Sequence, residues 1–197
     1  MSGFGEPILR PGIVAIAHYE EAMKRAVLAV KFASATRLAD ALGRALGHAV
    51  RTSGRRLSAV CFVPLHPSRL RTRGYDQAAL LAAGAARELG IPMLPLLRRR
   101  VANTQQARLG LLARHGNAAG LFTLSRSAPR VLPRRLLLVD DVMTSGATLE
   151  ACRATLLQSG CEHVLLGVAA LARPGRAQSE KARPVPRPTS PPTSTWG

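Results

Sequence analysis

The chain has 197 residues, which suits one domain with a hydrophobic core and an appended tail better than a two-domain enzyme. Apolar residues make up 47% of it, but no run reaches the roughly 20 apolar residues that a membrane-spanning helix needs, and the N-terminus shows no signal-peptide pattern. We therefore expect a cytoplasmic protein with no membrane partner. The three cysteines form no C-x-x-C pair, which argues against a disulfide framework and against a zinc site of the cysteine type.

The formal net charge is +17, and only three of the 28 basic residues are lysines. Arginine binds phosphate oxygens with two parallel hydrogen bonds, so this excess indicates an anionic partner such as a nucleotide, pyrophosphate or nucleic acid. A preference for arginine together with abundant alanine and glycine can equally reflect base composition. Two of the four aspartates, Asp140 and Asp141, are adjacent, and this is the first specific clue in so basic a chain.

In chain order, the first 18 residues are interrupted by glycine and proline, so we expect an N-terminal segment that packs loosely or forms one short strand. Apolar side chains then recur at helical spacing, which predicts two amphipathic helices over residues 19–32 and 37–50. Residues 57–63 are apolar and partly β-branched, and prolines follow, so we expect a buried strand that leads into a loop. An alanine-rich helix is predicted over residues 77–89.

The second half of the chain alternates in the same way between strands and a helix. The predicted elements are strands over residues 93–97, 121–124, 136–139 and 164–170 and a helix over residues 147–159. This alternation predicts an α/β fold with a mostly parallel sheet flanked by helices. Residues 174–197 contain six prolines and no Leu, Ile, Met or Phe, which predicts a disordered tail. The compact domain is therefore expected to cover residues 19–173.

The strongest motif is LLLVDDVMTSGAT at residues 136–148, where a buried strand ends in two carboxylates and a small turn opens a helix. In an open parallel sheet, ligands bind beyond the carboxyl ends of the strands, so Asp140 and Asp141 are expected at that edge. The backbone N–H groups of the turn, with the helix dipole behind them, predict a phosphate cradle. Acids beside such a cradle suit a sugar phosphate, because they accept hydrogen bonds from ring hydroxyls.

Three other interpretations of the acid pair fit the sequence less well. An Asx turn that caps a helix accounts neither for the doubled acid nor for the Thr-Ser-Gly-Ala-Thr order. A Walker B aspartate should accompany a G-x-x-x-x-G-K-[ST] loop, and none of the three lysines lies in one. A phosphoreceiver domain would need another aspartate on a later strand, and no aspartate follows Asp141.

Two basic segments accompany this motif. The first, VPLHPSRLRTRGYDQ at residues 63–77, places three arginines at alternate positions after a strand end, where a pyrophosphate would fit. Its His66 could donate to a phosphate or have a structural role. Its Asp76 could bind a ligand, but we favour an N-cap for the helix that begins at Gln77. The second segment, residues 98–117, is a long basic loop of the kind that often serves as a functional lid.

Together these segments resemble the ComF family, phosphoribosyltransferase-like proteins named for a role in DNA uptake during natural competence. The resemblance runs over residues 19–173 and follows the family's order. It covers the tract around Lys31 and Phe32, the V-P-L-H-P-x-R-x-x-x-R-G-[FY]-[ND]-Q segment, the R…Q-x-x-L…R-x-x-N-x-x-G-x-F segment and the motif at residues 136–148. The chain lacks the four-cysteine zinc ribbon with which many members begin, and it has Asp76 where asparagine is common.

The resemblance implies a type I phosphoribosyltransferase-like fold that binds 5-phosphoribosyl-1-pyrophosphate (PRPP) with Mg²⁺, which would arrive with PRPP and need no cysteine or histidine ligand. The catalytic acids Asp140 and Asp141 would contact the ribose hydroxyls. The 5′-phosphate would be held by Thr144, Ser145, Gly146, Ala147 and Thr148. The pyrophosphate would be bound by Pro64, Leu65, His66, Arg69 and Arg73. Residues 98–117 would form a flexible hood, whose Arg98 and Arg100 would also contact PRPP.

Two functions follow from this resemblance. In the first, a nitrogen acceptor displaces pyrophosphate from PRPP through an oxocarbenium-like transition state, as in nucleotide metabolism or salvage, and the hood excludes water. In the second, the chain is a non-catalytic accessory protein in competence that binds PRPP or single-stranded DNA, with an affinity for DNA that falls steeply as salt rises. Dimers are common in this fold, so a homodimer is a further expectation.

Overall fold

The computed structural model describes residues 5–32, 35–100 and 120–173. The predicted tail and residues 101–117 of the predicted hood lie outside the described residues. In chain order the elements are β1 (Ile8–Arg10), β2 (Ile13–His18), α1 (Glu21–Phe32), α2 (Thr36–Thr52), β3 (Ala59–Phe62), α3 (Pro67–Arg73), α4 (Gln77–Leu89), β4 (Leu97–Arg99), β5 (Phe122–Leu124), β6 (Arg135–Met143), α6 (Ala147–Gln158) and β7 (His163–Leu171).

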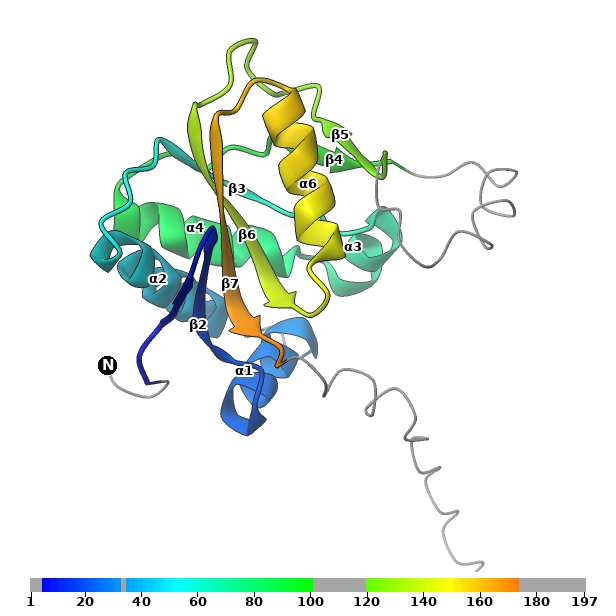
Figure 1. Cartoon of the computed structure of the whole chain (residues 1–197). Helices are drawn as coiled ribbons and strands as arrows, with labels where there is room; N and C mark the ends of the chain where they lie inside the picture. The colour runs from blue at the N-terminus through cyan, green and yellow to red at the C-terminus, as the bar shows by residue number, and fades with distance from the viewer. Residues whose placement is uncertain (1–4, 33–34, 101–119, 174–197) are drawn as a thin grey trace, which may run out of the picture.

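Five of the described strands form one sheet in the order β1-β2-β7-β6-β3 (Figure 1). Strands β2, β7, β6 and β3 are parallel to one another, and β1 pairs with β2 in the antiparallel direction. Strands β4 and β5 form a separate antiparallel ribbon. The predicted α/β fold with a mostly parallel sheet is therefore confirmed.

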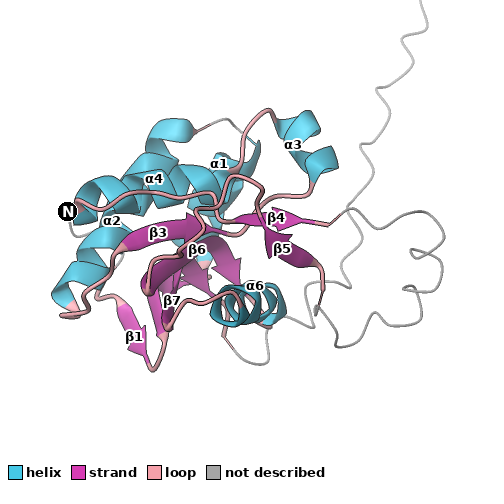
Figure 2. Ribbon diagram, turned by 90° about the horizontal axis from the view of Figure 1, so that it is seen from above, coloured by secondary structure: helices cyan, strands magenta, loops and turns pink. Residues whose placement is uncertain are grey.

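Helices cover both faces of the sheet, as the view from above shows (Figure 2). Helices α1, α2 and α4 share one core with Leu137 and Val139 of β6. Helix α6 and the β4–β5 ribbon share the other core with Leu136 and Leu138. Successive side chains of a strand point to opposite faces, so Leu137 and Val139 of β6 face α4 and Leu136 and Leu138 face α6. The carboxyl ends of the parallel strands lie at one edge, next to α1, α3 and the turn before α6 (Figure 1).

Helices α2 and α4 pack unusually close together because glycines meet where they cross. A Cβ atom added at Gly43 of α2 would lie 2.2 Å from the carbonyl oxygen of Leu81 and 2.9 Å from the Cα atom of Gly84. A Cβ atom added at Gly84 would lie 2.5 Å from the carbonyl oxygen of Asp40. These atoms belong to two helix backbones, which cannot move apart without disturbing the core on that face of the sheet.

We expect Gly43→Ala to lower the free energy of unfolding by about 1–3 kcal/mol, the usual cost of overpacking a core. The direction of the change in stability is informative, because alanine forms helices better than glycine by about 1 kcal/mol and would stabilise α2 if it had room. Denaturant unfolding followed by circular dichroism measures the change. As a control, Ala41→Ser on the exposed face of α2 should change the stability by about 0.5 kcal/mol or less. A Gly43→Ala chain as stable as the wild type would contradict this close packing.

The helices were predicted well, and the strands less so. The structure confirms the four predicted helices as α1, α2, α4 and α6 and the strands over residues 57–63, 121–124 and 164–170 as β3, β5 and β7. The predicted bounds of the strand over residues 93–97 were wrong. Met93 makes one isolated bridge to Val60, and the strand β4 begins only at Leu97. No helix in the described part of the chain is long and apolar enough to cross a membrane.

The N-terminal segment is more ordered than the sequence suggests. Strand β2 pairs with β7 inside the sheet, and its residues Val14 and Ala15 are buried. The expectation of a loose segment or a single short strand was therefore wrong, because residues 8–18 contribute both β1 and β2. The glycine-containing turn between them allows the chain to fold back on itself as a hairpin, which adds β1 to the edge of the sheet.

Candidate functional site

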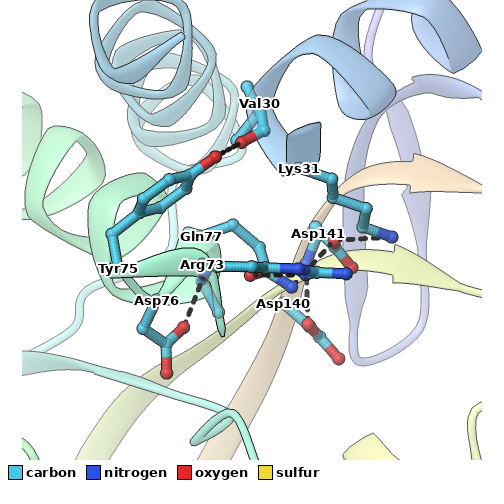
Figure 3. A network of polar contacts seen from close by, with 9 residues as sticks. Val30, Lys31, Arg73, Tyr75, Asp76, Gln77, Asp140 and Asp141 are labelled. Carbon is cyan, nitrogen blue, oxygen red and sulfur yellow. Dashed lines mark hydrogen bonds and ion pairs between the residues drawn. The ribbon is translucent and has the colours of Figure 1, made fainter. Parts of the chain in front are cut away.

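The acid pair lies inside strand β6 and not beyond its end. Asp140 is aligned with Val168 of β7, and the pairing continues as far as Met143 with Leu171. The expectation that the strand stops at Val139 was therefore wrong. The two carboxylates point apart (Figure 3): Asp141 contacts Gln77 on the side of α4, and Asp140 lies on the side of α6, where its charge acts on Cys152.

Asp141 is held by two side chains from distant parts of the chain (Figure 3). The Nζ atom of Lys31, in the last turn of α1, lies 2.8 Å from Oδ2 of Asp141. The Nε2 atom of Gln77, at the start of α4, donates to the same oxygen at 3.4 Å. Only 10% of the Asp141 side chain and 22% of the Lys31 side chain are exposed, so this ion pair is largely withdrawn from water.

Asp140 has a different environment. Its Oδ1 atom accepts a hydrogen bond from its neighbour's backbone N–H at 2.8 Å. Burial and the nearby carboxylate of Asp141 raise the pKa of Asp140 well above its usual value, and the more distant charge of Lys31 offsets only part of this. The two acids are thus chemically unequal: Asp141 has a cation beside it, and Asp140 carries a charge that its surroundings disfavour.

The turn after β6 forms the expected opening of a helix. Gly146 has φ 77°, the left-handed region that favours glycine, and it is the N-cap of α6. A Cβ atom there would lie 2.6 Å from Cε of Met143, the flexible end of a side chain that can move aside, so the positive φ is the main reason for glycine at this position. The rest of the predicted phosphate cradle is exposed at this edge: Thr144, Ser145, Ala147 and Thr148. The first backbone amides of α6 have no carbonyl partner within the helix, as at the start of any helix. One of them, Ala147 N, donates a long hydrogen bond to Ser145 Oγ at 3.5 Å.

The predicted pyrophosphate segment contains a short helix that the sequence analysis did not predict. Helix α3 begins at Pro67, and His66 is its N-cap, with Nδ1 accepting from the backbone N–H of Ser68 at 3.2 Å. His66 therefore has a structural role at this nitrogen. The expected loop is reduced to Pro64, Leu65 and His66, which are half-buried.

Asp76 caps helix α4, as favoured from the sequence. Its Oδ1 atom accepts from the backbone N–H groups of Ala78 at 3.0 Å and Ala79 at 3.3 Å. Its Oδ2 atom accepts from the backbone N–H of Leu65 at 2.8 Å, so that amide is already bonded within the protein. Burial raises the pKa of Asp76, and the three N–H donors offset part of this effect. Asp76 thus joins the segment before α3 to the start of α4.

The arginines of α3 and the end of α1 enclose a cavity of about 430 Å³. It is lined by Lys31, Phe32, Ser68, Arg69, Thr72, Arg73 and Tyr75. We call this cavity the anion pocket, because three cationic side chains and three hydroxyl groups surround it. Its cations are held in place: the Arg73 guanidinium lies over the Phe32 ring, 5.1 Å from the centroid, and its Nη1 atom donates to Gln77 Oε1 at 3.1 Å.

The two arginines predicted at the start of the hood, Arg98 and Arg100, lie at the β4–β5 ribbon. Arg98 is part of β4 and donates from Nε to the carbonyl oxygen of Leu124 at 3.2 Å, and the backbone N–H of Arg100 donates to the carbonyl oxygen of Leu121 at 2.8 Å. Neither residue lines the anion pocket. Lys31 lines the anion pocket together with Arg69 and Arg73 and also contacts Asp141, so it connects the pocket with the acid pair. The contact of Arg98 and Arg100 with PRPP stays a prediction.

Metal and thiol chemistry are both constrained by the described residues. No group of three or more His, Cys, Asp or Glu side chains among them could hold a metal ion by itself. Asp140 and Asp141 supply carboxylate oxygens, the kind of ligand that Mg²⁺ takes from proteins when its other ligands are phosphate groups and water. The cysteines are buried, and burial raises the pKa of Cys61 to about 11, so a thiolate nucleophile is not available at neutral pH.

Comparison with known proteins identifies the family. No family model matches the chain. Competence protein F of Haemophilus influenzae, however, is 36% identical to it over 159 residues, which cover 77% of this chain and 69% of that protein. The chain belongs to the ComF family. A second member, DNA utilization protein YhgH of Escherichia coli K12, is 30% identical over 158 residues, which cover 77% of this chain and 68% of that protein.

A solved structure supports the fold of this ComF chain. Adenine phosphoribosyltransferase from Leishmania tarentolae superposes with a TM-score of 0.50 over 88% of this chain and 84% of the enzyme, at 15% sequence identity. The predicted type I phosphoribosyltransferase-like fold is therefore confirmed. At this identity the likeness concerns the fold alone.

Sequence analysis missed the two residues of this ComF site whose side chains contact Asp141, namely Lys31 and Gln77. Both appear in the tracts that carry the family resemblance, but neither was assigned a role. Lys31 lies 110 positions before Asp141 in the sequence, so no local pattern could show their contact. The rarity of lysine was the available signal, because only three lysines occur in the chain and one of them is Lys31.

Proposed function

We propose that the chain binds PRPP together with Mg²⁺ and transfers the phosphoribosyl group to a nitrogen acceptor. The observation that carries this proposal is the juxtaposition at one sheet edge of the acid pair, the turn that opens α6 and the anion pocket. Each part suits one part of PRPP: the acids suit the ribose hydroxyls, the turn suits the 5′-phosphate, and the pocket suits the pyrophosphate.

The reaction needs little beyond positioning and charge stabilisation. A lone pair on the acceptor nitrogen forms a bond to the anomeric carbon as the bond from that carbon to the pyrophosphate oxygen breaks, and the electron pair leaves with the pyrophosphate. Arg69, Arg73 and Lys31 would stabilise the negative charge that accumulates there. Asp140 and Asp141 would hold the ribose hydroxyls and so fix the position of the anomeric carbon. When bound, Mg²⁺ would neutralise further phosphate charge, and the carboxylate of Asp140 or that of Asp141 would hold it, since the two lie on opposite faces of the sheet.

Calorimetric titration of PRPP with and without Mg²⁺ tests this function, followed by assays of pyrophosphate release with a panel of nucleobases and amines. We expect Mg²⁺-dependent binding in the micromolar range, about −8 kcal/mol, and release that depends on the acceptor. Binding without release for any acceptor would reject the transferase and leave a PRPP-binding protein. Absence of PRPP binding would reject the whole proposal.

The names of the relatives favour a second candidate, an accessory role in competence with binding of single-stranded DNA. Such a contact is supported by exposed arginines of α3, of β4 and of the position just after β4, namely Arg69, Arg71, Arg98 and Arg100. An electrostatic interface of this kind should weaken steeply as salt rises, in proportion to the number of phosphates neutralised. Fluorescence anisotropy with a labelled oligonucleotide between about 50 and 200 mM salt measures that slope. A flat profile would remove this candidate.

A further inference from the structure

Asp141 is connected to two cations of the anion pocket, directly to one and through Gln77 to the other (Figure 3). Lys31 contacts its Oδ2 atom at 2.8 Å. Gln77 donates from Nε2 to Asp141 at 3.4 Å and accepts from Arg73 Nη1 through Oε1 at 3.1 Å. The chain of contacts Arg73–Gln77–Asp141 therefore runs from the wall of the pocket to one member of the acid pair.

The chemistry of this link requires an amide. Its central residue must accept a hydrogen bond from a guanidinium and donate one to a carboxylate, and the glutamine amide does both, through its carbonyl oxygen and its NH₂ group, without carrying a charge. A glutamate would accept from Arg73 but repel Asp141, and a lysine would do the reverse. Gln77 is only 6% exposed, and it immediately follows Asp76, whose cap fixes the start of α4. Its place is thus set by the fold.

We propose that Gln77 is a positioning residue that aligns Asp141 for the ribose and Arg73 for the pyrophosphate, and so couples the two halves of the site. The proposal rests on the proposed binding of PRPP. Gln77 itself is not among the residues that line the pocket, and its side chain carries no charge. An effect of Gln77 on anion affinity would therefore come through Arg73 and not from direct attraction.

Two simple ligands test the two halves separately, namely inorganic pyrophosphate for the pocket and ribose 5-phosphate for the acids and the turn. We expect Gln77→Met, which has similar volume and no net charge change, to weaken each of them about five- to tenfold in calorimetry. Gln158→Met, at the exposed far end of α6, is the matched control and should leave both affinities unchanged. If Gln77→Met does not fold by circular dichroism, Gln77→Ala replaces it, because alanine is the best helix former.

Double variants separate positioning from a general structural effect. In an Arg73→Met background, Gln77→Met should no longer change the affinity for pyrophosphate, because the group that it aligns is gone. In an Asp141→Asn background, it should no longer change the affinity for ribose 5-phosphate. A merely structural role would instead lower both affinities equally in every background.

The outcomes distinguish this inference from the proposed function. If the wild type binds PRPP and both half-ligands, and Gln77→Met binds them as well as Gln158→Met does, the positioning role is wrong and the proposed function stands. If the effects of Gln77→Met persist undiminished in both double variants, the role is also wrong. A wild-type chain that binds none of the three ligands would overturn the proposed function and this inference with it.

Discussion

The double variant Asp140→Asn with Asp141→Asn is expected to lose PRPP binding by about 100-fold or more. A hydrogen bond to a charged group contributes about 1.5–3 kcal/mol and one to a neutral group about 0.5–1.5 kcal/mol, so the variant loses about 1–1.5 kcal/mol at each of the two acids. Calorimetry with Mg²⁺ and PRPP measures the loss, which should exceed the effect of any other substitution discussed here.

The chain offers a matched control for this double variant in Glu20 and Glu21. They are also adjacent acids, but they are exposed at the start of α1, with 47% and 86% of their side chains accessible. Glu20→Gln with Glu21→Gln changes the net charge by the same amount and should bind PRPP as the wild type does. Retained affinity in the Asp140 and Asp141 variant would show that the acid pair does not bind the ribose.

The single amide substitutions should have opposite effects on stability. Asp141→Asn leaves the Lys31 ammonium in a poorly solvated place without its carboxylate, which we expect to cost about 2–3 kcal/mol, less than a fully buried pair because Lys31 is partly exposed. Asp140→Asn instead removes a charge that burial and Asp141 disfavour, and it should stabilise the chain by about 1 kcal/mol. Denaturant unfolding at neutral pH measures both, and effects of the same sign would show that the two environments are alike.

The raised pKa of Asp140 also fixes the direction of a pH dependence. Between the ordinary aspartate pKa of 3.8 and the raised pKa of Asp140, the folded chain binds more protons at this carboxyl than the unfolded chain does. Its contribution to stability is therefore complete below 3.8 and is lost as the pH rises through the raised pKa. Asp76 acts in the same direction. The free energy of unfolding of Asp140→Asn should fall less with rising pH than that of the wild type, and parallel curves would contradict this assignment.

The helices could be predicted well from local sequence because residues that cap helices stand at their ends. The bounds of α4 agree with the prediction of residues 77–89, since Asp76 caps its start and Gly90 ends it in the left-handed conformation. Helix α3 was not predicted because the prolines after residue 63 indicated a loop, although proline is well suited to the first turn of a helix, where Pro67 lies. Strand β6 was predicted too short because charged residues were expected to lie beyond a buried strand.

The parts of the site that are contiguous in sequence could be predicted, and the contacts between them could not. The turn at Gly146 and the basic stretch with Arg69 and Arg73 were both recognised from local residue order. The position of Lys31 depends on how α1 crosses the ends of the strands, which is a consequence of packing around the sheet. The link through Gln77 likewise exists only because the start of α4 and the end of α3 meet β6 at one edge.

The placement of the two acids inside a strand makes the site sensitive to whether the number of residues ahead of them is odd or even. The side chains of β6 alternate between the two faces from Leu136 to Val139, so deleting or inserting one residue there would turn Asp141 from Lys31 toward α6. A change of two residues would restore the face of Asp141 and shift the acid pair along the strand. The stretch from Leu136 to Asp141 should therefore tolerate changes of length only in steps of two.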